Sequence, residues 1–116
     1  MNDIDLIYYN HTGTVFYLKR CTINEVNRIQ LVFNKRAFHL SKDELYRLKD
    51  AIKISLQTLS ELEHPITEND TIAIKLDSSS DEFCVNLMEL KALDDLICGT
   101  LFHLNFESTI ADLIRL

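Results

Sequence analysis

Residues that interrupt regular structure are scarce in this chain, which has two glycines and one proline among 116 residues. The chain also has no tryptophan. Phosphate-binding loops need closely spaced glycines, and Gly13 and Gly99 stand far apart. A glycine-rich nucleotide loop is therefore excluded, and neither G-x-S-x-G nor H-E-x-x-H occurs. So little glycine and proline, with 47% apolar residues, is typical of a globular protein and not of a disordered or fibrous one.

Cysteine is also sparse, and long apolar runs are missing. Cys21, Cys84 and Cys98 are widely separated and form no C-x-x-C pair, which is typical of free thiols in a reducing compartment. No apolar run approaches the ~20 residues that span a bilayer. The first residues hold two aspartates and no basic cluster before an apolar stretch, unlike a secretory signal. We therefore predict a cytoplasmic protein.

Charge is divided unevenly along the chain, whose net value is −6. Residues 1–58 contain nine Lys or Arg against six Asp or Glu, and residues 59–116 contain three against twelve, so the halves carry +3 and −9. The overall acidity argues against a nucleic-acid binder, because phosphate contacts dominate that affinity. Halves of opposite charge favour attraction across a protein interface. Five basic residues would form either a solvated rim of the strand ends or a strip that contacts an acidic partner or RNA. They are Lys19, Arg20, Arg28, Lys35 and Arg36.

Alternation of apolar and polar residues predicts six short strands. The first two flank the sequence NHTGT, in which Gly13 is the expected turn residue, and they form a hairpin. The third strand places Ile29, Leu31 and Phe33 on one face and returns through a turn at residues 34–36. The predicted strands span residues 4–9, 14–20, 28–33, 37–40, 70–76 and 83–85.

A change to steps of three and four residues predicts the first helix. Its apolar stripe runs from Leu45 to Leu62. Ser41 precedes the stripe and Glu44 follows three residues later, which is the pattern of a capping box. Pro65 is expected to end this helix, because proline cannot continue the hydrogen-bond ladder.

A second helix repeats this arrangement, with Asn86 and Glu89 as the capping pair and a stripe that ends at Leu104. Gly99 lies inside it at a cost of about 1 kcal/mol relative to alanine. This glycine indicates either fraying or close packing. Residues 105–116 could prolong the helix or form a short separate one, and the sequence leaves both open.

The two strand–cap–helix segments match each other at an offset of 45 residues. Any two capped amphipathic helices share leucines, but they would not also hold one register from strand through cap to helix end. We therefore predict an internal ββα repeat. The identical positions are Phe38/Phe83, Glu44/Glu89, Leu45/Leu90, Leu48/Leu93, Asp50/Asp95, Ile52/Ile97, Leu56/Leu101 and Leu59/Leu104.

These elements predict a single α+β domain over residues 1–116, with both helices on one face of an antiparallel sheet of about six strands. The order is ββ-ββα-ββα: a hairpin and connection (1–27), two ββα units (28–64 and 70–104) and a helical tail (105–116). The other sheet face would then expose apolar side chains that a second subunit could cover. Candidates for that face are Tyr8, Val15, Phe16, Tyr17 and Val32.

The segments IQLVF…FHLSKDELYRLKDAI and IAIKLDSSSDEFCVNLMELKALDDLI resemble a small uncharacterised family of Bacteroidetes-type bacteria, a domain of unknown function. The resemblance covers residues 10–104 and lies in an I-Q-L-x-F strand and a strand–cap–E-L helix in the same order. It implies no established activity. It also implies a histidine and paired cysteines in the first hairpin; His11 and Cys21 match the histidine and one cysteine, and the C-x-x-C partner is missing.

Two arrangements of side chains could hold a metal. Glu61 and His64 form E-x-x-H, as in di-iron bundles, but the second helix has no such pair, and histidine is favoured at a helix C-terminus by the dipole alone. Four possible zinc ligands lack the tight C-x₂₋₄-C spacing of structural sites. They are His11, Cys21, His39 and Cys84.

A nucleophile–base pair of Cys98 and His103 would need converging side chains, but residues five apart do not share a helix face. A buried, unreactive cysteine is the more ordinary state. No catalytic, cofactor-binding or metal-ligating residue is therefore predicted.

The sequence predicts a non-enzymatic interaction or scaffold domain whose partner is another protein or a second copy in a homodimer. The alternative is a small-ligand or metal-binding regulatory protein that uses His11, Cys21 and the open sheet face. No cofactor, membrane or nucleic acid is expected. A flat apolar sheet face would indicate a protein partner, and a concave polar one would indicate a ligand.

Overall fold

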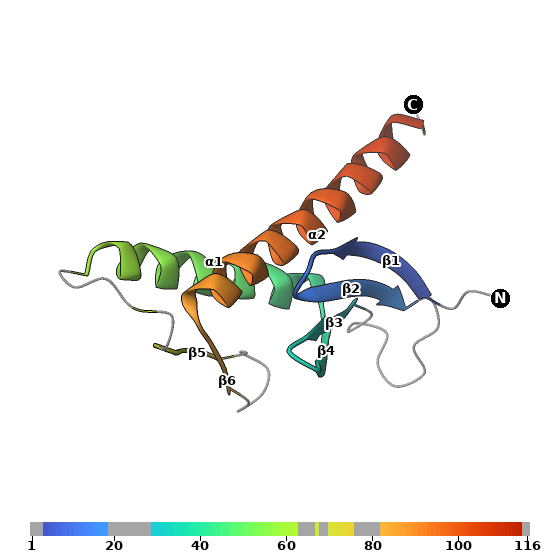
Figure 1. Ribbon diagram of the computed structural model, residues 1–116. Coiled ribbons are helices and arrows are strands. Elements are labelled where there is room, and N and C mark those ends of the chain that lie inside the picture. Colours follow the sequence, from blue (N-terminus) through green and yellow to red (C-terminus); the bar gives the residue numbers. More distant parts are fainter. Residues whose placement is uncertain (1–3, 19–28, 63–66, 68–69, 76–81, 115–116) are drawn as a thin grey trace.

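The computed structural model describes residues 4–18, 29–62, 67, 70–75 and 82–114. They form an α+β fold, as predicted, in which four strands precede the first helix and two precede the second (Figure 1). Predicted strand ends at residues 19–20, 28 and 76 lie outside the described residues. The elements are β1 (Ile4–Tyr9), β2 (Gly13–Leu18), β3 (Ile29–Phe33), β4 (Arg36–Leu40), α1 (Lys42–Ser60), β5 (Ile72–Lys75), β6 (Glu82–Val85) and α2 (Leu87–Ile114).

The described strands form two antiparallel sheets, so the prediction of one six-stranded sheet is wrong. β1, β2, β3 and β4 pair in sequence order, and β5 pairs with β6. The Arg36 guanidinium of β4 donates to the backbone carbonyl of Glu82 in β6 over 3.3 Å. A side-chain hydrogen bond therefore links the sheets at a point where one continuous sheet would need a backbone ladder.

The β3–β4 turn has a strained backbone for its residues. Asn34 and Lys35 both have positive φ, 51° and 63°, which is the type I′ arrangement of two-residue hairpins. Asparagine tolerates this region well, whereas the Cβ of lysine crowds the following carbonyl oxygen. The turn therefore holds its register at some cost in stability.

Lys35→Gly is expected to raise the free energy of unfolding by about 1 kcal/mol, because glycine adopts positive φ without that crowding. Urea unfolding followed by circular dichroism should show a higher midpoint at an unchanged slope. Lys53→Gly, at an exposed position of α1, is the matched control and should lower stability by about 1 kcal/mol. A lower midpoint for Lys35→Gly would contradict the turn geometry.

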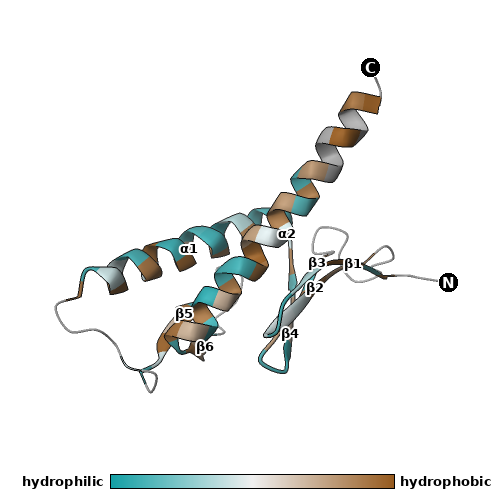
Figure 2. Ribbon diagram, turned by 45° about the horizontal axis from the view of Figure 1, so that its top comes forward, coloured by the Kyte–Doolittle hydropathy of each residue, from teal (hydrophilic) through white to brown (hydrophobic). Residues whose placement is uncertain are grey.

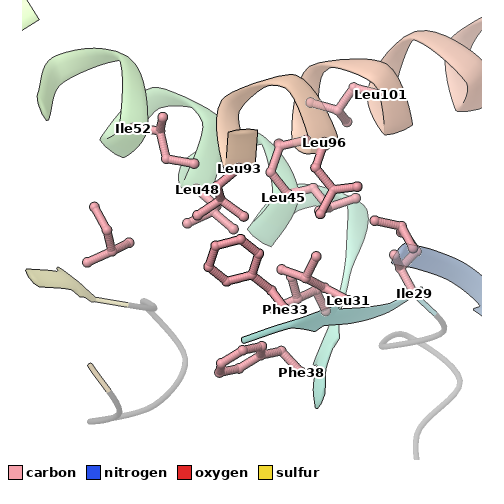
Figure 3. Close-up of a cluster of buried hydrophobic side chains, with 14 of the residues drawn as sticks. Ile29, Leu31, Phe33, Phe38, Leu45, Leu48, Ile52, Leu93, Leu96 and Leu101 are labelled. Atoms are coloured by element: carbon pink, nitrogen blue, oxygen red, sulfur yellow. The ribbon is translucent and has the colours of Figure 1, made fainter. Parts of the chain in front are cut away.

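One hydrophobic core joins both sheets and both helices, and Figure 3 shows the buried leucines of α1 and α2 gathered over β3 and β4. The predicted alternation in β3 is confirmed, because Ile29, Leu31 and Phe33 are all buried. Ile74 of β5 reaches the same core from the second sheet. Leu96, which the sequence stripe left out, is also fully buried.

Both predicted capping boxes are present. The Ser41 hydroxyl accepts from the Glu44 amide over 3.2 Å, and the Glu44 carboxylate accepts from the Ser41 amide over 3.1 Å. Asn86 and Glu89 make the same two bonds, at 2.8 and 3.0 Å. Each helix therefore begins where its cap satisfies the first free amides.

α1 ends at Ser60 with Glu61 as its C-cap, so the prediction that Pro65 ends it is wrong. In the last turn, the Ser60 hydroxyl donates to the carbonyl of Gln57 over 2.6 Å, an example of side chains competing for the helical ladder. Pro65 and His64, the proposed partner of Glu61 in E-x-x-H, lie outside the described residues.

α2 is the longest element, and residues 105–114 prolong it without a break. Its 28 residues span about 42 Å at 1.5 Å per residue. Figures 1 and 2 show its C-terminal half leaving the sheets and projecting from the body of the molecule. The molecule is accordingly elongated, with extents of 52 × 32 × 25 Å.

Candidate interaction surface on the second helix

The projecting half of α2 carries a row of exposed apolar side chains. Leu104 is still half-buried, and beyond it every α2 residue whose burial is described is exposed. We name the row the α2 stripe. Its members and their exposed fractions are Phe102 (65%), Phe106 (53%), Ile110 (40%), Leu113 (62%) and Ile114 (79%).

The stripe has helical spacing. Steps of four, four and three residues place Phe102, Phe106, Ile110 and Leu113 within roughly 80° around the helix axis. The rings of Phe102 and Phe106 are stacked, with centroids 6.0 Å apart and planes 12° apart. The buried Leu93 lies on roughly the opposite side of the same helix. Ile110 and Ile114, however, lie five full turns beyond the buried Ala92 and Leu96, on the same sides of the helix. The stripe therefore borders the core face and extends around the helix from it.

β1 covers this side of α2 just before the stripe begins. The Tyr8 ring lies directly on Gly99, where an added Cβ would be 2.5–2.7 Å from the ring carbons. The Tyr8 hydroxyl donates to the Asp95 carboxylate, 3.2 and 3.3 Å from its two oxygens. Of the two alternatives that the sequence left for Gly99, the structure shows close packing. The stripe thus starts where β1 stops covering the helix.

The environment of Tyr8 keeps it a hydrogen-bond donor. Burial against the helix raises the pKa of Tyr8, and the adjacent Asp95 carboxylate raises it further. The phenol is therefore protonated at neutral pH and donates to Asp95. Its ring also lies 5.8 Å from that of His103, between centroids. Together these contacts fix β1 on α2.

Asn10, which the sequence analysis did not single out, ties the β1–β2 turn to α2. Its side-chain oxygen accepts from the amides of Thr12 and Gly13, at 3.0 and 3.1 Å. Its side-chain amide donates to the carbonyl of Ala92 over 2.8 Å and to Asp95 over 3.1 Å. Asparagine at the end of a strand is a common turn signal, but only the fold shows its second partner.

Gly13 serves packing and not turn flexibility. Neither glycine has positive φ, and Gly13 is the first residue of β2. A Cβ at this position would lie 2.6 Å from the carbonyl oxygen of Val32 and 2.9 Å from a methyl of Leu96. Both glycines of the chain therefore allow the first hairpin and α2 to approach closely.

α1 supports the base of the projecting half. The Asn105 side-chain amide donates to the Tyr46 hydroxyl over 2.9 Å, and Leu104 packs against the core. At the 45-residue offset, Phe102 corresponds to Gln57 of α1 and Phe106 to its C-cap residue Glu61, and both of these are exposed. The apolar stripe is thus a property of the second helix alone, on a base that the body holds in place.

A second apolar surface is the face of the four-stranded sheet that points away from the helices. Ile4 and Leu6 lie on it opposite Leu18 and Phe16, with Ile4 49% and Leu6 55% exposed. Of the residues predicted for this face, the structure places two there, Phe16 and Val32, and packs three on the core side, Tyr8, Val15 and Tyr17.

The side chains considered as zinc ligands are not brought together. Within the described ranges, no group of three or more His, Cys, Asp or Glu is placed to hold a metal ion. His11 is exposed in the β1–β2 turn, His39 on β4 and Cys84 on β6. Cys21 lies outside the described residues.

Cys98 and His103 face different neighbours. The Cys98 thiol donates to the Asp94 carboxylate over 3.6 Å, whereas His103 lies beside Tyr8. Burial raises the pKa of the Cys98 thiol and Asp94 raises it further, while Lys49 and Lys53 of α1 act in the opposite direction. A thiol with a raised pKa is a weak nucleophile at neutral pH. The arrangement therefore does not activate Cys98.

Cys98 is expected to react several-fold more slowly with iodoacetamide at neutral pH than the exposed Cys84, because less of it is thiolate. Peptide mapping by mass spectrometry resolves the two rates. Asp94→Asn removes a charge that raises the Cys98 pKa, so it should speed this reaction. Equal rates at Cys98 and Cys84, or no response to Asp94→Asn, would contradict the assignment.

Some basic residues of the first half of the chain lie close to acidic residues of the second half within the molecule. Lys49 and Lys53 of α1 act on the same thiol as Asp94 of α2, so basic and acidic halves meet along the two helices. In the predicted basic strip, Arg36 also stacks 4.9 Å over the Phe38 ring. The other basic positions at 19, 20 and 28 lie outside the described residues. Charge alone therefore does not identify an external partner.

Within the part of the chain that the structure describes, neither helix is both long and apolar enough to cross a membrane. No protein-family model, curated protein or solved structure matches the chain. The functional argument accordingly depends on the surface itself.

Proposed function

We propose that this chain is a non-enzymatic interaction domain that binds a protein through the α2 stripe. The observation that supports it is an exposed apolar face on a helix that projects from a packed body. Contiguous apolar surface on a small domain marks interaction sites. Apolar residues in steps of three and four on one helix are the form used in helix-in-groove and helix–helix contacts.

Burial of the stripe supplies a sufficient driving force. At roughly 200 Å² for a whole aromatic side chain and somewhat less for an aliphatic one, the exposed fractions correspond to about 500 Å² per chain. Burying this area contributes on the order of 12 kcal/mol at about 25 cal/mol per Å². Association itself costs roughly 4–15 kcal/mol, and an already ordered helix keeps this cost low. The stripe therefore supports weak to moderate binding.

We also propose three properties that the sequence predicted. They are a cytoplasmic location, membership of the uncharacterised bacterial family, and an origin of the two ββα units as copies of one another. The matching capping pairs, Ser41 with Glu44 and Asn86 with Glu89, support the repeat. No observation on the described residues favours the metal-binding alternative, and purified protein with less than about a tenth of an equivalent of zinc would exclude a tight site.

The proposal is tested with one stripe variant and one matched control. Phe106→Gln replaces an exposed stripe residue, and Ile54→Gln replaces a comparably exposed apolar residue of α1 (65%). Proteins from a lysate of the source cell that bind the immobilised wild-type domain would be purified, and the affinity of each for the domain and its variants would be measured. The self-association of the domain and its variants would be measured in parallel. We expect at least tenfold weaker binding for Phe106→Gln and unchanged binding for Ile54→Gln. Absence of any partner, including a second copy, would overturn the proposal.

A further inference from the structure

We infer that the occupant of the α2 stripe is the α2 stripe of a second copy, in an antiparallel helix pair. This inference rests on the proposed function and names its partner. Four observations support self-pairing: the apolar residues of the stripe, their spacing, the area they expose and the projecting position of the helix.

Antiparallel pairing gives the stripe a complementary register. A two-fold axis beside position 108 places Phe102 of one copy opposite Ile114 of the other, and Phe106 opposite Ile110. The layers formed by these four residues each pack one large aromatic ring against one branched aliphatic side chain, and Leu113 lies opposite His103. A parallel pair would set phenylalanine on phenylalanine at one end and aliphatic on aliphatic at the other, with unequal layers.

The exposed area fits a dimer of modest stability. Two stripes together remove about 1,000 Å² from water, which is near the lower limit of specific protein interfaces. A concentration-dependent equilibrium between monomer and dimer is therefore expected, not a permanent dimer. The half-exposed Leu6 on the far sheet face takes no part in it.

The shape of the chain permits this contact. The stripe lies on the half of α2 that extends beyond the sheets (Figure 1). In an antiparallel pair, the two bodies lie at opposite ends of the helix pair and do not collide, whereas a parallel pair would bring them side by side. The hydrogen bond from Asn105 to Tyr46 ties the base of the projecting half to α1.

The nature of the contact distinguishes it from charge attraction. Each copy carries a net charge of −6, so copies repel one another weakly at long range, and added salt screens that repulsion. The dimerisation affinity of an apolar helix pair should therefore be at least as high in about 1 M salt as in about 0.1 M salt. A dimer held by the basic and acidic halves would dissociate instead.

Sedimentation velocity over a concentration series at both salt levels tests the inference with the full chain. We expect a monomer–dimer equilibrium that salt does not weaken, at least tenfold weaker for Phe106→Gln and unchanged for Ile54→Gln and Leu6→Ser. Circular dichroism confirms that each variant is folded. A monomer at every concentration, or a dimer that Phe106→Gln leaves intact, would overturn the inference. The monomer result would leave binding to a different protein, and so the proposed function, standing.

Orientation is tested by cysteine cross-linking. A mixture of Phe106→Cys and Ile110→Cys chains should give the mixed disulfide as the main new product on mild oxidation, located by peptide mapping. Phe106→Cys alone should cross-link at position 106 several-fold less. A predominant 106–106 disulfide would show a parallel pair and overturn the antiparallel assignment.

Discussion

Gly13→Ala is expected to lower the free energy of unfolding by about 3 kcal/mol, at the upper end of the usual cost of overpacking. The added Cβ would lie 2.6 Å from the carbonyl oxygen of Val32, and a backbone atom in the middle of a sheet has no rotamer by which to move away. Because Gly13 has no positive φ, alanine there would otherwise stabilise the protein, since it lowers the conformational entropy of the unfolded chain. Urea unfolding measures the loss.

The control for this prediction is the same Gly13→Ala substitution in a chain where the neighbouring Leu96 is shortened to alanine. Shortening Leu96, whose methyl would lie 2.9 Å from the new Cβ, removes one close contact but not the carbonyl of Val32. Gly13→Ala should therefore remain destabilising by more than about 1 kcal/mol in a Leu96→Ala background. A neutral effect of Gly13→Ala in the wild-type chain would show that β2 and β3 are not packed as described.

Gly99→Ala is expected to lower the free energy of unfolding by about 2 kcal/mol, although alanine favours a helix by about 1 kcal/mol over glycine. The new Cβ would lie 2.5–2.7 Å from carbons of the Tyr8 ring, so β1 would have to move off α2. Thermal or urea unfolding measures the change. A gain in stability would mean that helix propensity decides and that Tyr8 does not lie on Gly99.

A double-mutant cycle separates the contact from the propensity. Unlike the carbonyl beside Gly13, the atoms that crowd Gly99 belong to one side chain, which a mutation can remove. In a Tyr8→Ala background, Gly99→Ala should become neutral or stabilise the protein by up to about 1 kcal/mol. The sign of the Gly99→Ala effect should therefore reverse between the two backgrounds, and equal effects in both would rule out the contact.

Local patterns were enough to predict the order of the elements and the first residues of both helices. The alternation in β3 placed Ile29, Leu31 and Phe33 in the core, as the structure confirms. The two capping pairs located the first residues of both helices. These features depend on neighbours within a few residues, and physical propensity acts at that range.

Relations between distant elements could not be predicted in the same way. The two sheets are linked where the Arg36 side chain of β4 donates to the Glu82 carbonyl of β6, and no local pattern in the sequence records that contact. For Gly99, the sequence analysis left fraying and close packing open, because the ring that lies on it comes from Tyr8, 91 positions earlier. Asn10 was overlooked for the same reason.

The fold explains some of the differences between the two ββα units. The sequence showed exposed basic residues of the first helix replaced in the second, including Arg47 by Ala92 and Lys53 by Cys98. The structure buries Ala92 where the Asn10 side chain donates to its backbone carbonyl, so the small side chain at this position lets the first hairpin pack on α2. The change from Gln57 and Glu61 to Phe102 and Phe106 serves no contact of this kind. That change is the part of the difference that we assign to binding.

The most direct test of the central claim, that the α2 stripe pairs with the stripe of a second copy, is an isotope-filtered nuclear Overhauser experiment on a mixture of labelled and unlabelled chains. We predict intermolecular signals between the Phe106 ring protons and the Ile110 methyl groups, growing with protein concentration. A spectrum without intermolecular signals from any stripe residue, at concentrations where the chain self-associates, would contradict it.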